Sequence, residues 1–138
     1  MANLDNTYMD FALSLAENSK ATRAKVGAVL VTADEVVLTG YNGTPSGTSN
    51  VMEKFNADGI AYETMPEVLH AELNCILKAA KQGVSCKGAT VYVTLSPCVH
   101  CAAMLTQVGI KRLVYGSKYR QPDGIEYLIK NNIQVERG

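Results

Sequence analysis

The sequence has 138 residues, with 13 Lys and Arg against 13 Asp and Glu, so its formal net charge at neutral pH is zero. A chain of this length can bury about 70% of its unfolded surface in one core, and we expect a single domain over residues 1–138. Hydrophobic residues make up 47% and charged residues 19%, which excludes intrinsic disorder, and the balanced charge argues against binding to a nucleic-acid backbone. There is no apolar run of roughly 18 residues and no basic secretion signal, so we expect a cytoplasmic protein without a membrane partner.

The first half of the chain is predicted to form one helix and one β-hairpin. Apolar residues at helical spacing predict a helix over residues 4–18, and β-branched runs predict paired strands over 26–31 and 36–40. Residues 41–47 are rich in turn formers, and residues 48–66 have no regular period. We expect the latter to be a long loop, with at most one helical turn, of the kind that is often functional.

The second half is predicted to alternate between helices and strands. Gly83 is the expected C-cap of its first helix, and Ser96 and Pro97 are the expected N-cap and first residue of its second. The predicted elements are helices over 67–82, 97 to 107 or 108, and 124–131, and strands over 90–95, 110–115 and 133–136. Strands separated by helices pair in parallel, whereas a hairpin is antiparallel. The sequence therefore predicts an α/β protein with three α/β/α layers and a mixed sheet of about five strands.

Four cysteines raise the question of disulfides or metal. Without an export signal, clustered cysteines are better explained by metal binding or catalysis, and only Cys98 and Cys101 are clustered. We expect Cys75 to pack as a small buried apolar residue and Cys86 to be a half-exposed loop thiol.

Two short segments combine residue types that bind zinc. His70 and Glu72 fall near the start of one predicted helix, and Cys98 and Cys101 near the start of the next. One imidazole and two thiolates are three protein ligands, which leaves the fourth tetrahedral position of Zn²⁺ open for water, as in catalytic sites. The two cysteines share a helix face in the first turn, where the helix dipole favours thiolates. By itself, a Cys-x-x-Cys pair is also typical of a redox pair or of half a structural zinc site.

Glu72 is the predicted general base. Two thiolates neutralise the zinc charge and make the metal less electrophilic, so a nearby carboxylate is needed to activate the water. Residues 70 and 72 would point to different sides of a regular helix, and we expect His70 or its neighbour to occupy the irregular N-terminal edge. His100 points away from the face of the two cysteines and is expected on the surface.

These segments resemble the signature of the zinc-dependent cytidine/deoxycytidylate deaminase superfamily, which is His-x-Glu followed by Pro-Cys-x-x-Cys. The resemblance is most specific to the deoxycytidylate (dCMP) deaminases, in the compact form of phages and bacteria, and it covers most of residues 10–135. If a phage encodes the chain, the expected compartment is the host cytoplasm. The segments that carry the resemblance are residues 19–20, 25–28, 40–47, 69–74, 92–98 and 109–115.

The resemblance implies hydrolytic deamination of dCMP to dUMP and ammonia, which supplies dUMP for thymidylate synthesis. Zinc on His70, Cys98 and Cys101 would lower the pKa of a bound water, and Glu72 would move protons from the water to N3 and to the exocyclic amine of cytosine. Some phage relatives hold a second, structural zinc on Cys and His in the segment before the His-x-Glu motif. Since residues 48–69 contain neither residue type, we expect one zinc per chain.

The resemblance also implies substrate contacts. The backbone of Ala71 and the carbonyl of Ser96 are expected at the base edge, Asn42 at the sugar and Tyr119 on the phosphate side, with Lys20 as a third choice. Candidates for a phosphate pocket are the basic and polar residues near the first hairpin strand and after the fourth strand: Ser19, Lys20, Arg23, Lys25, Tyr115, Lys118, Tyr119 and Arg120. Each basic residue among them is equally well explained as a solvated surface charge.

Regulation and assembly are expected from the resemblance alone. Family members are commonly homohexamers that dCTP activates and dTTP inhibits. Residues 41–47, with Asn42, Gly43 and Thr44, are the expected place for an effector triphosphate with Mg²⁺. A hexamer interface would need apolar surface from residues such as Ile76, Leu77 and Met104, which fit the core equally well.

Other activities stay open at this point. The chain is also compatible with dCTP as a second substrate, and the same signature occurs in deaminases of cytidine, guanine, tRNA adenosine and single-stranded DNA. Zero net charge and the absence of Trp argue against the nucleic-acid substrates. The non-enzymatic alternative is a zinc-bearing nucleotide-binding regulator. Glu72 argues against it, because a structural zinc needs no carboxylate there.

Overall fold

The computed structural model of the protein describes residues 3–21, 24–43, 53–55, 62–64, 69–119 and 121–138. The elements in chain order are α1 (Asp5–Ala16), β1 (Gly27–Val31), β2 (Val37–Tyr41), β3 (Glu53–Phe55), β4 (Tyr62–Thr64), α2 (Ala71–Gln82), β5 (Thr90–Leu95), α3 (Val99–Gln107), β6 (Arg112–Ser117), α4 (Asp123–Lys130) and β7 (Gln134–Arg137). Within these ranges, no helix has the length and apolar character needed to cross a membrane.

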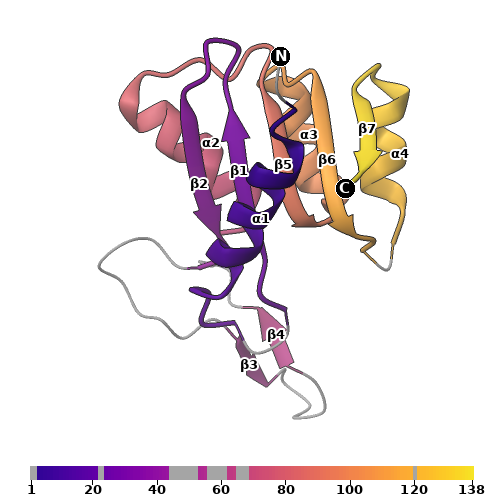
Figure 1. Ribbon diagram of the computed structural model, residues 1–138. Helices are drawn as coiled ribbons and strands as arrows, with labels where there is room; N and C mark the ends of the chain where they lie inside the picture. The colour runs from indigo at the N-terminus through magenta and orange to yellow at the C-terminus, as the bar shows by residue number, and fades with distance from the viewer. Residues whose placement is uncertain (1–2, 22–23, 44–52, 56–61, 65–68, 120) are drawn as a thin grey trace.

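Five strands form one mixed sheet in the order β2-β1-β5-β6-β7. β1 is antiparallel to both β2 and β5, whereas β5, β6 and β7 are parallel. α3 connects β5 to β6 and α4 connects β6 to β7, as parallel pairing requires (Figure 1). The predicted mixed sheet of about five strands is confirmed.

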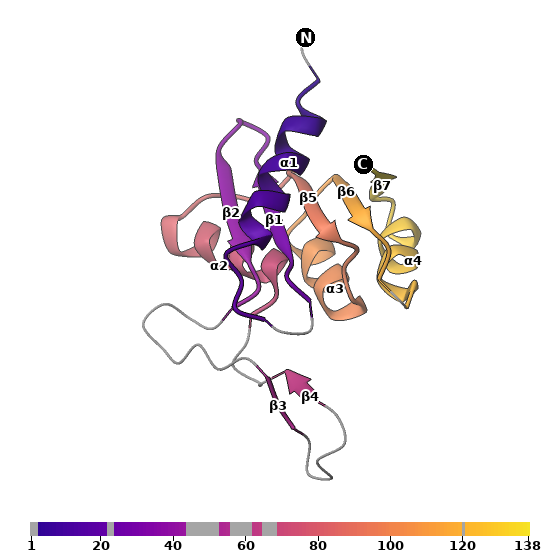
Figure 2. The same ribbon diagram turned by 60° about the horizontal axis from the view of Figure 1, so that its bottom comes forward.

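Helices cover both faces of this sheet and make three layers. Side chains alternate along β1, where Ala28 and Leu30 pack in a core on the side of α2, α3 and α4, and Val29 packs in a smaller core with Met9 and Ala12 of α1. Figures 1 and 2 show α1 alone on one face and the other three helices on the opposite face. The predicted α/β/α architecture is therefore confirmed, with two cores of unequal size.

The stretch predicted as a long loop contains two short strands. β3 and β4 pair antiparallel, with Lys54 opposite Glu63, and Figures 1 and 2 both show them apart from the five-stranded sheet. The prediction was wrong here because three residues are too few to reveal an alternating pattern. The rest of that stretch lies outside the described residues.

Two helices begin later than predicted. α2 begins at Ala71 and not at residue 67, because Leu69 is extended and exchanges two hydrogen bonds with Gly43, of 2.8 and 3.0 Å. α3 begins at Val99 with Cys98 as its N-cap, because the Ser96 N–H still donates to the Ser117 carbonyl in the sheet, at 2.8 Å. Ser96 and Pro97 are therefore not the N-cap and first residue of α3.

The other predicted boundaries hold more closely. Gly83 ends α2 in the left-handed conformation, with φ of 70°, as expected of a C-cap glycine. The strand predicted over residues 110–115 lies two residues later, because the Ile110 N–H still bonds to Leu105 at the end of α3. Cys75 is fully buried as predicted, but the prediction for Cys86 was wrong, since it is only 7% exposed in the larger core.

Candidate active site

The metal-binding candidates lie where α2 and α3 begin. His70 is the N-cap of α2 and has extended backbone angles, φ −67° and ψ 156°, while Cys98 is the N-cap of α3. His70 therefore occupies the irregular edge that the spacing to Glu72 demanded. Cys101 lies in the first turn of α3, and α2 and α3 pack against each other.

Close packing of α2 on the sheet sets the place of His70. A Cβ atom on Gly40 of β2 would lie 2.4 Å from the Ala71 carbonyl oxygen, so glycine allows the helix to approach the strand. The Asn74 amide donates to the Tyr41 carbonyl at 2.7 Å and ties the first turn of α2 to the end of β2. Together with the Leu69–Gly43 bridge, these contacts fix the backbone on both sides of His70.

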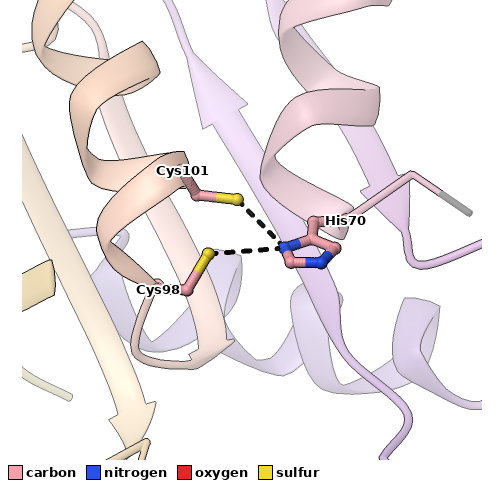
Figure 3. Close-up of side chains that lie close together, drawn as sticks. All are labelled: His70, Cys98 and Cys101. Atoms are coloured by element: carbon pink, nitrogen blue, oxygen red, sulfur yellow. Dashed lines mark hydrogen bonds between the residues drawn. The ribbon is translucent and has the colours of Figure 1, made fainter. Parts of the chain in front are cut away.

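The three candidate ligands point toward one another (Figure 3). The His70 Nδ1 atom lies 3.1 Å from Cys101 Sγ and 3.7 Å from Cys98 Sγ, and all three donor atoms lie within 4.8 Å of one another. Around tetrahedral zinc, sulfur and nitrogen ligands are about 3.5 Å apart, given a Zn–S distance of about 2.3 Å and a Zn–N distance of about 2.0 Å. The two measured separations bracket this value, so the donor set fits zinc and uses Nδ1 of the imidazole.

The charges of these three side chains also suit a divalent cation. A hydrogen bond from Cys101 is the main cause that lowers the pKa of Cys98 to about 3, and the His70 imidazole adds to the effect. The same hydrogen bond, then burial and the charge of Glu72, raise the pKa of Cys101. The hydrogen bond to Cys98 also raises the pKa of His70. Metal ligands have to be deprotonated, so a cation that binds here displaces the protons that these groups carry.

Glu72 lies within the protein, in the first turn of α2. Its side chain is 4% exposed, and burial raises the pKa of its carboxyl to about 7. Its own backbone N–H and the charge of His70 lower the pKa, and the charge of Cys98 raises it further. A carboxyl with a pKa near neutrality can both accept and donate a proton at physiological pH.

This arrangement and the sequence point to the same family. The profile described as "Cytidine and deoxycytidylate deaminase zinc-binding region" matches residues 2–117. The chain belongs to the cytidine and deoxycytidylate deaminase family.

Named relatives of this deaminase include phage enzymes. The deoxycytidylate deaminase of Enterobacteria phage T2 is 31% identical over 163 aligned residues, with 91% of this chain and 87% of the relative covered. That of Enterobacteria phage T4 is 32% identical, with 91% and 84% covered. A crystal structure of the dCMP deaminase from cyanophage S-TIM5, in complex with dCMP and dUMP, matches with a TM-score of 0.89 and 38% identity, and covers 100% of this chain and 99% of that one.

The predicted sugar contact, Asn42, has both ends of its amide engaged within the deaminase. Its Oδ1 accepts the Val26 N–H at 2.9 Å and its Nδ2 donates to the Ala24 carbonyl at 2.8 Å. The buried Ser19 hydroxyl donates to the Asn42 carbonyl at 2.9 Å. An amide has two N–H groups and two lone pairs, so Asn42 keeps one of each for a ligand.

The backbone of Tyr119 is bound to Ser96, which precedes the candidate ligand Cys98 by two residues. The Tyr119 N–H donates to the Ser96 hydroxyl at 2.6 Å, and the side chain of Tyr119 is 39% exposed. The side chain of Tyr119 also lines a surface pocket that includes the candidate ligand Cys98. The other lining residues are Val99, His100, Gln121, Asp123 and Gly124. His100 is exposed, as the sequence predicted.

The remaining predicted contacts lie in different environments. Ala71 is fully buried at the start of α2, Lys20 is exposed next to the buried Ser19, and Tyr115 is buried in the larger core. All three stay predictions as substrate contacts. Thr44, Arg23 and Arg120 lie outside the described residues.

Sequence reasoning missed residues that act through their neighbours. Asn74 orients the start of α2 through its bond to Tyr41. Gly124, at the start of α4, lies so close to the segment before Cys98 that a Cβ atom on it would be 2.0 Å from the Pro97 carbonyl oxygen. The hydroxyl of Ser96 was missed as well, although its carbonyl was considered. A single sequence offers no signal for these roles, because each depends on a partner at least 20 residues away.

Proposed function

We propose that this protein is a zinc-dependent dCMP deaminase that hydrolyses dCMP to dUMP and ammonia. The observation that carries the proposal is the pairing of an open three-donor set, His70, Cys98 and Cys101, with the buried carboxyl of Glu72. The relatives add the substrate class, since dCMP deaminases of phages match nearly the whole chain and one of them was crystallised with dCMP and dUMP.

His70, Cys98 and Cys101 would hold one zinc ion per chain. When bound there, zinc supplies a Lewis acid that makes water a nucleophile at neutral pH. The three protein ligands leave one position open, which distinguishes this set from closed structural sites.

Glu72 would move the protons of the reaction. It accepts one proton as water attacks C4 of cytosine and delivers that proton to N3. It then accepts the second proton, from the hydroxyl group formed on C4, and gives it to the amine, which leaves as ammonia while C4 keeps the oxygen as a carbonyl. The buried environment that raises its pKa to about 7 supports this double role, because one group has to serve as base and then as acid.

The substrate contacts are proposals that rest on the family resemblance. The Ala71 backbone and the Ser96 carbonyl would hold the base edge, Asn42 the sugar, and Tyr119 the phosphate side. Tyr119 is supported by its bond to Ser96, two residues before Cys98. Lys20 and Tyr115 are weaker proposals, because neither has a described contact with the ligand set.

Regulation, assembly and localisation stay predictions. They comprise activation by dCTP and inhibition by dTTP, an effector site with Mg²⁺ near Asn42, Gly43 and Thr44, a homohexamer, dCTP as a second substrate, and action in the cytoplasm, which the phage relatives would place in the host cell. Leu77 and Met104 are 44% and 41% exposed, which leaves both available for an interface between copies.

The test is ammonia release from dCMP, CMP, dCTP, cytidine and deoxycytidine by zinc-loaded protein. We expect the highest kcat/KM for dCMP and loss of activity after chelation of zinc, with recovery when zinc is restored. Activity on deoxycytidine but not on dCMP would overturn the substrate assignment. No activity on any substrate, with zinc bound at one ion per chain, would favour the non-catalytic regulator.

A further inference from the structure

The five-stranded sheet ends in two edge strands, β2 and β7, which differ in how their own residues protect them. β7 is four residues long and carries the charged side chains Glu136 and Arg137, which discourage a further strand from pairing there. β2 has the sequence Val-Leu-Thr-Gly-Tyr, with no charged residue and no proline. An uncharged edge strand of high β propensity is open to pairing with the same strand of another copy.

The hydrogen bonds of the β-hairpin show which residues of β2 face the free edge. In an antiparallel pair, residue positions that bond to the neighbouring strand alternate with positions that do not. The Asn42 N–H donates to the Val26 carbonyl at 3.1 Å, so the even-numbered residues of β2 bond to β1. The backbone N–H and carbonyl groups of Val37, Thr39 and Tyr41 therefore point away from β1.

Side chains of α2 cover two of these outward carbonyls. Lys78 Nζ donates to the Thr39 carbonyl at 2.7 Å, and the Asn74 amide donates to the Tyr41 carbonyl at 2.7 Å. Asn74 and Lys78 are four positions apart and so lie one turn apart on the same side of the helix. Figure 1 shows α2 beside β2, and the two elements pack against each other. α2 thus takes up two successive acceptors of the edge strand.

Pairing of two β2 strands would conflict with Lys78. Two copies related by a two-fold axis would bring the same strand of each copy together, antiparallel. With the axis at Thr39, the Thr39 N–H of each copy needs the Thr39 carbonyl of the other, and Lys78 already occupies that carbonyl. The two ammonium groups would also meet at the seam, where like charges oppose pairing.

We infer that Lys78 closes the β2 edge against a second copy of this chain. Its ammonium group occupies an outward acceptor and supplies the charge that the strand itself lacks. Lys78 is exposed, so its hydrogen bond adds little to the stability of one copy. The inference does not depend on the proposed function, and it leaves the other faces of the molecule free for assembly.

The test is the association of full-length, zinc-loaded and reduced protein, measured by sedimentation velocity over a range of concentrations. Lys78→Ala uncovers the Thr39 carbonyl and removes the charge. We expect this variant to form larger species at concentrations at least about tenfold lower than the parent does, because each copy gains a hydrogen bond and the repulsion is lost. Hydrogen exchange in the same samples should become slower over residues 37–41, where outward N–H groups become bonded.

Three further variants separate edge pairing from other causes of association. Lys81→Ala removes the same charge from another exposed position of α2 and should associate as the parent does. Lys78→Arg keeps a cationic donor and should also behave as the parent. Val37→Lys, added to Lys78→Ala, returns a charge to the edge strand at a residue that is 39% exposed, and it should reverse the association.

Several results would overturn the role of Lys78. One is equal association of Lys78→Ala and the parent at every concentration. Another is association that Val37→Lys does not reverse, or that leaves exchange over residues 37–41 unchanged, because the contact between copies then lies elsewhere. A Tm for Lys78→Ala more than about 3 °C below that of the parent would show that Lys78 supports the fold of a single copy, and would overturn the inference as well.

Discussion

Glu72 combines burial with a position in the first turn of α2, where its backbone N–H lowers the pKa that burial raises. Replacing it with glutamine keeps the size and hydrogen-bonding capacity of the side chain but removes proton transfer. We predict that Glu72→Gln lowers kcat for dCMP about 10³-fold and leaves the zinc content at one ion per chain. Ammonia release and metal analysis of the same preparation measure both effects.

An exposed glutamate on another helix provides the control. Glu126 lies on the surface of α4, and Glu126→Gln should leave kcat unchanged. Turnover in Glu72→Gln within threefold of the parent would contradict the role of Glu72 as proton carrier. Loss of zinc from that variant would instead make Glu72 a part of the metal site.

Asp5 and Arg112 are 107 positions apart along the chain and form a contact that depends on pH. Arg112 donates to both oxygens of Asp5, at 2.9 and 2.6 Å, and also binds Glu136. The hydrogen bond from Arg112 is the main cause that lowers the pKa of Asp5 from 3.8 to about 2. Since the folded state has the lower pKa, this contact stabilises the protein fully above pH 3.8, and its contribution is lost as the pH falls toward 2.

We predict that Asp5→Asn lowers the free energy of unfolding by about 1 kcal/mol at pH 6, as for a partly exposed bidentate pair, and by less at pH 3. Urea unfolding at the two pH values measures the difference. Asp10→Asn, which changes an exposed carboxylate of the same helix, is the control and should have little effect at either pH. A difference that grows between pH 6 and pH 3 would contradict the assignment.

At the scale of single residues, the sequence could predict the side chains that would bind the metal or transfer protons themselves. His70, Glu72, Cys98 and Cys101 have reactive groups at a spacing that restricts them to one site, and three of them do meet in the fold. The hydrogen bonds that the Ser96 hydroxyl and the Asn42 amide make within the fold could not be predicted, because their partners lie 16 to 23 positions away along the chain.

Among the elements, α4 packs closely against the segment Pro97–Cys98 because residue 124 is a glycine. Any side chain at Gly124 would overlap the Pro97 carbonyl and push α4 away from the loop that carries Cys98. We predict that Gly124→Ala lowers the free energy of unfolding by about 1–3 kcal/mol, in spite of the higher helix propensity of alanine, and weakens zinc binding. Urea unfolding and competition with a chelator measure the two effects.

The control for this variant is Glu126→Ala, in the same turn of α4 but exposed to solvent. It should change the free energy of unfolding by less than about 0.5 kcal/mol. A stabilised Gly124→Ala protein with unchanged zinc affinity would show that α4 can shift without disturbing the ligand loop.

Element boundaries were less predictable than element types. Ser96 and Pro97 have the residue types of a helix start, but pairing with Ser117 keeps Ser96 in the sheet and delays α3 to Val99. The same competition places Leu69 in a bridge with Gly43 and not in α2. In both cases a backbone hydrogen bond between residues far apart in the chain outweighed the helix preference of the residues themselves. A single sequence reveals that local preference but not the distant partner.

For the whole molecule, a zinc ion on His70, Cys98 and Cys101 would join the starts of α2 and α3 more firmly than the sheet alone does. We predict that removal of zinc lowers the Tm by about 5–10 °C, because a ligand that binds only the folded state stabilises it. Scanning calorimetry of the zinc-free and zinc-restored protein measures the shift. An unchanged Tm would contradict a bound zinc in the purified protein.

Alkylation of the four cysteines provides an independent measurement on the same samples. Zinc removal should make Cys98, which is partly exposed, and then Cys101 reactive toward iodoacetamide. Cys75 and Cys86 should stay protected in both forms, since they are 0% and 7% exposed. Equal labelling of all four in the zinc-free protein would mean that the fold itself depends on the metal.

The paired hydrogen bonds between Gly43 and Leu69 have a consequence for how the chain can be altered. They join Gly43 to Leu69, the residue before His70, across the 25 residues that separate the two along the chain. Since Gly43 and Leu69 are already bound to each other, the number of residues between them can change without pulling on the backbone that carries the imidazole. A foreign peptide or a small reporter domain inserted between Gly43 and Leu69 should therefore leave the geometry of His70, Cys98 and Cys101 unchanged.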